Sequence, residues 1–137
     1  MTVDLEALGL AIKRAQYRNH RTMDAALRPV GVSLVQWDAL RAIDRMPGAS
    51  GHDLAAATFQ SDQAFGTLAN RLVDRGLIAR SAGRGRRLEH ELTDAGRAAL
   101  AEGHEVAAGV LGELFAPLDE EQRAAMSKLL RILTAET

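Results

Sequence analysis

The sequence predicts a mostly α-helical fold that carries one small β-hairpin. Alanine, leucine and arginine dominate its 137 residues, a composition that favours helices. Apolar residues recur at steps of three and four along most of the chain, whereas between residues 77 and 92 they alternate with polar ones, as in strands. The length suits one domain, since domains usually hold roughly 100 to 150 residues. We therefore expect residues 1–137 to form a single domain.

Two helices are expected in the first third of the chain. A stripe of apolar residues at helical spacing runs from Leu5 to Leu27, and Pro29 closes it. Ser33 followed three residues later by Gln36 forms a capping box, which predicts the start of a second helix. The inward face of that helix is expected to contain Trp37, Leu40 and Ile43.

Two shorter helices are expected next, separated by a turn of about three residues. Ser50 with Asp53 marks the start of the first, and Ser61 can cap the second. Gly76 suits the left-handed conformation that commonly ends a helix. The apolar positions are Leu54, Ala55 and Phe59 in the first of these helices and Phe65, Leu68 and Leu72 in the second. Such a pair is typical of a helix-turn-helix.

A β-hairpin and two further helices complete the pattern. Alternating residues around 77–80 and 88–92 predict two strands, joined by a loop rich in glycine and arginine, Gly83–Arg87. Thr93 can cap a fifth helix that Pro117 ends, and Asp119 can cap a last one. The stripe of the last helix is Met126, Leu129, Leu130 and Leu133. Close approach of another helix would compensate for the low helix propensity of Gly103, Gly109 and Gly112.

The net charge of −1 conceals a segregation of charge along the chain. Residues 71–87 contain six arginines and one aspartate, whereas residues 98–137 contain seven acidic and three basic side chains. A polyanion would therefore meet the middle of the chain and avoid its end.

Several function classes lack support in the sequence. The chain has no cysteine, which excludes disulfides, thiolate metal sites and a thiol redox sensor. Its four histidines lack the close spacing of a helical metal site, and no nucleophile elbow, phosphate loop or dinucleotide fingerprint is present. No apolar stretch reaches the length of a signal peptide or a membrane span. We expect a soluble, cytoplasmic protein that is not an enzyme and needs no cofactor or metal.

The second helix of the helix-turn-helix and the hairpin tip carry the residue types that double-stranded DNA requires. Short polar side chains on a helix can bind base edges in the major groove, whereas arginine binds phosphates and narrow minor grooves. The helix residues that point away from the core are Gln63, Ala64, Thr67, Asn70 and Arg71, and Ser61 at the helix start can bond a phosphate. The tip adds Arg84, Arg86 and Arg87. These residues are the predicted DNA-binding site.

The chain resembles the MarR family of bacterial transcriptional regulators over essentially its full length. The matching stretches are LGLAIKRAQ, SLVQWDALRAI, PGASGHDLAAATF, DQAFGTLANRLVDRGLIAR and LEHELTDAGRAAL. The strongest signature is the pair LVDRGLIAR and LTDAGR around the basic hairpin. The chain departs from the family at the hairpin, where many members carry Asp-x-Arg, because Arg84 stands in place of the acid.

The resemblance implies a winged helix-turn-helix protein that acts as a triangular homodimer on a palindromic DNA site. Residues 31–92 would be the DNA-binding unit, and residues 1–30 and 93–137 the dimerisation helices. Many relatives bind small aromatic effectors in a cleft between these regions. Here Tyr17, His20 and Trp37 would line it, although Trp37 suits plain core packing as well.

The resulting hypothesis is a transcriptional repressor that occupies a promoter and is released by a small aromatic ligand. A regulator without an effector, or an activator, fits the same residues. A winged-helix dimer that serves as a protein-interaction module is the alternative from another class. Strong salt dependence of DNA affinity distinguishes a regulator from such a module.

Overall fold

The structure, a computed structural model, describes residues 2–85 and 87–135. In chain order its elements are α1 (Leu5–Leu27), the 3-10 helix η1 (Arg28–Val30), α2 (Leu34–Arg45), α3 (Gly51–Ala57), α4 (Asp62–Asp74), β1 (Ile78–Ala82), β2 (Leu88–Leu92), α5 (Asp94–Leu114) and α6 (Glu120–Thr134). The predicted fold, mostly α-helical with one hairpin, is confirmed.

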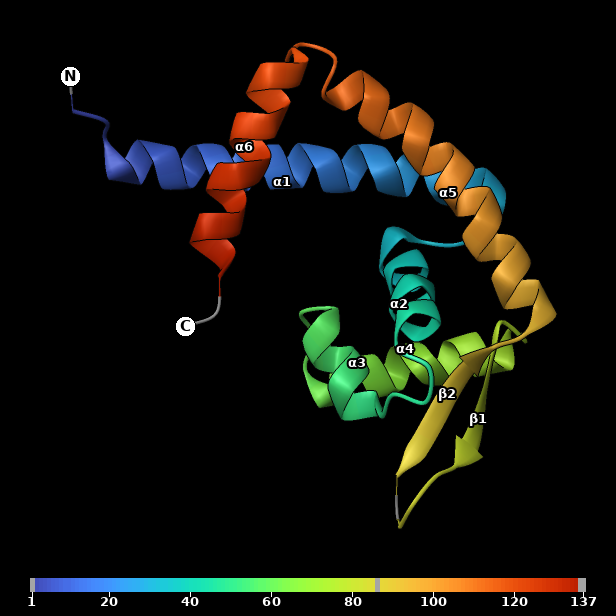
Figure 1. The fold of residues 1–137 in the computed structure, drawn as a ribbon. Coiled ribbons are helices and arrows are strands. Elements are labelled where there is room, and N and C mark those ends of the chain that lie inside the picture. Colours follow the sequence, from blue (N-terminus) through green and yellow to red (C-terminus); the bar gives the residue numbers. More distant parts are fainter. Residues whose placement is uncertain (1, 86, 136–137) are drawn as a thin grey trace.

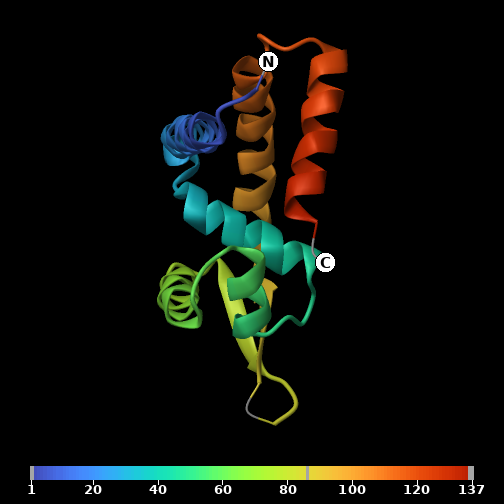
Figure 2. The same ribbon diagram turned by 90° about the vertical axis from the view of Figure 1, so that its left-hand side faces the viewer.

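The elements form two regions: the terminal helices α1, α5 and α6, and a central region of α2, α3, α4 and the hairpin. Helix α2 lies where the two regions meet, because it packs on both α1 and α5. Figure 1 shows α1, α5 and α6 at one end of the molecule and the hairpin at the other, with α2, α3 and α4 between them. Figure 2, seen from the side, shows the hairpin extending beyond α3 and α4, away from α5 and α6. Helix α5 leaves strand β2 and packs on both α1 and α2, so it connects the two regions.

Side-chain caps place the helix starts where the sequence predicts them. Capping boxes open α2 at Ser33, α3 at Ser50 and α6 at Asp119, and in each the third helical residue bonds back to the cap backbone. Ser61 and Thr93 cap α4 and α5 through a hydroxyl that accepts a backbone N–H. Each cap satisfies amides that have no partner within the helix.

The core lies mainly in α2, α3, α4 and the hairpin, and the C-terminal half of α1 and one side of α5 pack against it. The largest fully buried side chains are Leu27, Leu40, Leu54, Phe65, Leu72 and Ile78. Of α1, only the C-terminal half contributes buried residues, Met23 and Leu27, and no described residue of α6 is buried. The N-terminal half of α1 and the whole of α6 therefore keep most of their apolar surface exposed in a single chain.

The end of α3 corrects one prediction. Phe59 is not an inward-facing residue of that helix: α3 ends at Ala57, and Phe59 is 98% exposed in the turn that follows. The amide of Gln60 bonds to Ala55 O and that of Phe59 to Ala56 O, which is the Schellman arrangement with Phe59 at its left-handed position, φ 60°. The turn between α3 and α4 accordingly spans four residues, 58–61.

Gly103 allows α5 to approach α2 closely, as the glycines of this helix suggest. A methyl group at Gly103 would overlap the indole of Trp37, whose Nε1 donates a hydrogen bond to Leu100 O over 3.2 Å. Apart from the adjoining residues and the nearby backbone of α5, no heavy atom of the described residues lies within 4 Å of where a Cβ would stand on Gly109 or Gly112. Of these three glycines, only Gly103 is therefore explained by the close approach of another helix within the described chain.

Candidate nucleic-acid interface

Helix α4 presents a continuous polar face to solvent. Phe65, Ala69 and Leu72 are buried on one side, and Ser61 caps the helix by accepting the amide of Ala64 at 3.1 Å. The predicted DNA-binding residues of this helix are all exposed: Ser61, Gln63, Ala64, Thr67, Asn70 and Arg71. They lie together because steps of three and four residues return to the same face of a helix.

Two contacts organise this polar face. The hydroxyl of Thr67 donates to Gln63 O at 3.2 Å, one turn earlier in the helix. The side-chain oxygen of Asn70 accepts a hydrogen bond from Nη2 of Arg80, which belongs to β1. Asn70 therefore links α4 to the hairpin, a contact that the sequence pattern did not reveal.

The hairpin is antiparallel and pairs Ile78 with Leu92 and Arg80 with His90. The described residues of the loop between the strands, 83–85 and 87, lie at the end of the molecule that is farthest from α1 and α6 (Figure 1). Within that loop Arg84 is exposed, and Gly85 adopts the left-handed conformation, φ 65°. Arg86, the central arginine of the predicted tip, lies outside the described residues.

Arg87 lies at the base of the loop, where it is bonded to the central region. Its Nη2 donates to Gly48 O at 3.1 Å and lies 3.5 Å from a carboxylate oxygen of Asp53. Hydrogen bonds from the side chain and backbone of Ser50 lower the pKa of Asp53, and Arg87 adds to that effect. Arg87 thus fixes the hairpin against the loop between α2 and α3. The sequence predicts Arg87 as a DNA-binding residue, whereas the structure gives its guanidinium these contacts within the chain.

His90 supports the interface from behind. Its side chain faces inward from β2 and is 4% exposed, as the strand alternation predicts. Nδ1 lies 3.2 Å from Ala49 O, and the ring meets that of Phe65 edge to face at 6.0 Å. Burial lowers the pKa of His90. His90 is therefore a structural residue that joins the hairpin to α4.

One acidic residue, Asp62, lies in the first turn of α4. The carboxylate of Asp62 is 3.0 Å from Nδ1 of His52, and both side chains are exposed. The cationic residues Arg71, Arg80 and Arg84 lie farther along α4 and on the hairpin. An anion would meet its cations on the hairpin side of this face, while the helix start offers backbone amides.

A cleft of about 630 Å³ lies between the terminal helices and α2. His20 and Trp37, two of the three predicted ligand-binding residues, line it, whereas Tyr17 is not part of the lining. Tyr17 is instead 61% exposed on α1, with the guanidinium of Arg21 above its ring at 5.6 Å. Trp37 is 3% exposed, so it is also a core residue.

The cleft contains polar groups that the sequence reading missed. Arg41 lies over the Trp37 ring at 4.7 Å, and His104 meets that ring edge-on at 5.2 Å. Burial raises the pKa of Asp38 against the opposing effect of Arg41 and His20. Trp37 and Arg41 lie four residues apart on α2, and this spacing could have predicted their contact, because such residues are neighbours on a helix.

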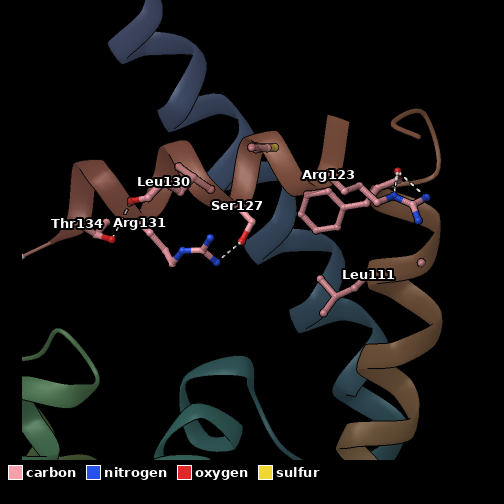
Figure 3. Close-up of a pocket in the computed structure, with 9 residues that line it drawn as sticks. Leu111, Arg123, Ser127, Leu130, Arg131 and Thr134 are labelled. Carbon is pink, nitrogen blue, oxygen red and sulfur yellow. Dashed lines mark hydrogen bonds between the residues drawn. The ribbon is translucent and has the colours of Figure 1, made fainter. Parts of the chain in front are cut away.

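A second groove, lined mainly by apolar groups, separates α6 from α5. Figure 3 shows Leu111 on α5 and Leu130 on α6 across this space of about 540 Å³, with Arg123 held by its two bonds to Phe115 O. Further exposed apolar residues on the terminal helices are Leu5, Leu8, Leu10 and Ile12 on α1 and Leu129, Ile132 and Leu133 on α6. This surface is typical of a site where another protein chain binds.

Other site types find no support in the described parts of the chain. Across residues 2–85 and 87–135 there is no group of three or more side chains placed to hold a metal ion. Nor does any described helix combine the length and apolar character that crossing a membrane requires.

Comparison with known proteins points to one family. Residues 30–87 match the model of the MarR family. The HTH-type transcriptional repressor Rv2887 of Mycobacterium tuberculosis is 35% identical over 113 residues, which cover 78% of this chain and 81% of that protein.

Two crystal structures of Rv2887 have the same fold as this chain. Its complex with DNA superposes with a TM-score of 0.77 at 27% identity and covers 93% of this chain and 98% of that one. Its complex with salicylic acid superposes with a TM-score of 0.75 at 30% identity and covers 92% and 95%. The likeness therefore extends over the terminal helices as well as the central region.

Proposed function

This chain belongs to the MarR family, and from that premise we propose that it is a sequence-specific transcriptional repressor that binds a palindromic DNA site as a homodimer. The observation that carries the proposal is the exposed polar face of α4 beside an arginine-bearing hairpin. The relative Rv2887 has been crystallised with DNA, which supports the same activity here. The curated relatives that it matches are named transcriptional repressors, and we accordingly place its action on DNA in the cytoplasm.

Residues 31–92 form the proposed DNA-binding unit, and residues 1–30 and 93–137 the proposed dimerisation helices. In a dimer, two α4 helices would enter successive major grooves about one helical turn apart, with the hairpins beside them. Gln63 and Thr67 would read base edges, and Ser61, Arg71 and Arg84 would bind phosphates. Repression follows because an occupied promoter is closed to polymerase.

The cleft beside Trp37 is the proposed effector site, and a small aromatic acid is the proposed ligand class. Support comes from the salicylic acid complex of Rv2887 and from the aromatic and cationic groups of this cleft, Trp37, His104 and Arg41. A ligand that prefers a different separation of the two DNA-binding units would lower DNA affinity by its differential affinity for the two states.

Selection of bound sequences from random duplex DNA by the purified protein tests the proposal. We expect a palindromic motif, and an affinity that falls with salt with a slope near −0.9 per phosphate contact. Gln63→Ala should change the preferred bases, whereas Arg84→Ala should weaken binding to all sequences and reduce the salt slope by about one. Binding without sequence preference, and indifferent to Arg84, would favour a protein-interaction module instead.

A further inference from the structure

Arg75 closes the recognition helix α4 and is bonded to a distant part of the chain. It is the first residue after α4, at the C-cap position. Nη1 donates to Oε1 of Gln36 at 2.9 Å, and Nη2 donates to Gly31 O. The guanidinium therefore satisfies two acceptors that precede it by 39 and 44 residues.

Both acceptors belong to the junction between the dimerisation helix α1 and the central region. Gly31, with φ 89°, ends the short helix η1 that follows α1. Gln36 lies in the first turn of α2, where the same Oε1 also accepts the amide of Ser33 at 3.1 Å as part of the capping box. Through this one oxygen, Gln36 thus caps the start of α2 and binds the residue that ends α4.

A third contact extends this connection into α1 itself. The carboxylate of Asp24 accepts the amide of Leu34, the first residue of α2, at 2.7 Å. The start of α2 is therefore bonded to α1 on one side through Asp24 and to the end of α4 on the other through Gln36. No other route of side-chain hydrogen bonds joins α4 to α1 within residues 2–85 and 87–135.

We propose that Arg75 is a positioning residue that fixes the orientation of α4 relative to α1, and thereby the separation of the two recognition helices in the dimer. The inference rests on the proposed function, because separation matters only if two copies bind one DNA site. We assign Arg75 to Gln36 and Gly31 rather than to DNA because both of its terminal guanidinium nitrogens already donate to these acceptors. Arg71, one turn earlier and exposed, has no such role and serves as the contrasting residue.

The experiment compares binding to the full palindrome, obtained by selection with the wild type, with binding to a duplex that carries one half-site. For Arg75→Gln we expect full-site affinity to fall roughly tenfold while half-site affinity stays within about twofold, because the reading surface is intact. We also expect the variant to discriminate less against palindromes whose half-sites are moved apart or together by one base pair. The ratio of the two affinities does not depend on the fraction of folded protein.

Matched variants separate positioning from charge and from capping. Arg71→Gln removes the same charge one turn earlier, within α4, and should weaken both duplexes alike, with a smaller salt slope. Gln36→Glu keeps an acceptor for both Ser33 and Arg75 and should preserve the wild-type ratio. Gln36→Ala should lower the ratio, and Arg75→Gln combined with it should add little, because both changes remove one contact.

Three outcomes contradict the proposal in distinguishable ways. Equal losses on the two duplexes in Arg75→Gln, with a reduced salt slope, would make Arg75 a DNA contact. An unchanged affinity ratio and spacing preference would show that the contact has no positioning effect. If the wild type selects no palindrome at all, the proposed function fails, and the inference fails with it.

Discussion

Phe59 occupies a backbone position that usually belongs to glycine. Helices α3 and α4 end in the same way, with the residue after the cap in the left-handed conformation: Phe59 at φ 60° and Gly76 at φ 73°. A side chain with a β-carbon is strained there by about 1–2 kcal/mol. Since Phe59 is 98% exposed, burial within its own chain does not offset that strain.

We therefore expect Phe59→Gly to stabilise the isolated fold. The free energy of unfolding should rise by about 0.5–1 kcal/mol, because relief of strain exceeds the added chain entropy of glycine. Urea denaturation measures it. Phe65→Ala, at a buried aromatic six residues later, should instead destabilise the protein by about 3–5 kcal/mol. A clear loss of stability in Phe59→Gly would mean that Phe59 packs against another surface.

His90 gives stability a pH dependence of definite sign. Because burial lowers its pKa in the folded state, the unfolded chain binds a proton first as the pH falls. The free energy of unfolding should be constant above the ordinary histidine pKa of about 6.5 and should decrease below it. Urea midpoints between about pH 5 and 8 measure this, since histidine titrates in that range. His90→Asn, whose side-chain nitrogen takes the place of Nδ1 and keeps a donor for Ala49 O, should show a shallower decrease; an identical slope would contradict the prediction.

At the scale of elements, the contact between α2 and α5 depends on the absence of one methyl group. Trp37 lies against Gly103 and bonds to Leu100 O, so the two helices meet at the indole. Separating them would expose Trp37, which also lines the proposed effector cleft. A change in the packing of α5 on α2 would therefore also change the shape of the cleft.

Gly103→Ala should destabilise the protein by about 1–3 kcal/mol, the usual effect of overpacking a core, despite the better helix propensity of alanine. Gly109→Ala in the same helix, where the space around the backbone is open, is the control and should leave stability equal or higher. Thermal unfolding with tryptophan fluorescence reports both, since Trp37 is the single tryptophan. Equal melting temperatures for Gly103→Ala and wild type would contradict the tight contact.

The elements themselves were predictable because their signals are local. Capping residues such as Ser33, Ser50 and Asp119 bond within three residues, so the sequence alone identifies the helix starts. The end of α3 was mispredicted because Phe59 is an apolar residue at helical spacing, and the left-handed position that it occupies usually holds glycine, so its residue type does not indicate a helix end.

For the candidate site, the sequence predicted which side chains are exposed but not which residues they contact. The polar face of α4 follows from its apolar face, and all the residues predicted on it are exposed. The partners of Arg87 and Asn70 were not predictable, because Gly48 and Arg80 meet them only through the fold. Arg41 lies one turn from Trp37 on α2, so its place beside the indole could have been predicted, whereas His104 on α5 reaches the cleft only through the fold.

At the scale of the whole molecule, the terminal helices carry apolar surface that a single chain does not cover. Leu133 on α6 is 67% exposed, and no described residue of that helix is buried. Lys128 lies on the opposite side of α6 from Leu133, given the helical repeat. A second copy of the chain would bury the apolar side and leave Lys128 in solvent.

Leu133→Glu should dissociate the proposed homodimer. Loss of a buried leucine and burial of an acid should weaken dimerisation by at least about tenfold, and binding to the palindrome with it. Lys128→Glu introduces the same acid on the opposite side and should leave the dimer intact. Sedimentation equilibrium measures the dissociation constants, and a Leu133→Glu variant that stays fully dimeric would place the interface elsewhere.

Thr93, the one residue between β2 and α5, has a consequence for how an effector can act at a distance. Its amide bonds to Leu77 O, its hydroxyl donates to Gly76 O, and it also caps α5. These bonds couple the orientation of α5 to that of β2. In the proposed homodimer, a tilt of α5 would therefore carry the arginine-bearing hairpin with it, so a ligand in the proposed effector cleft would shift the hairpin along the DNA backbone without touching it.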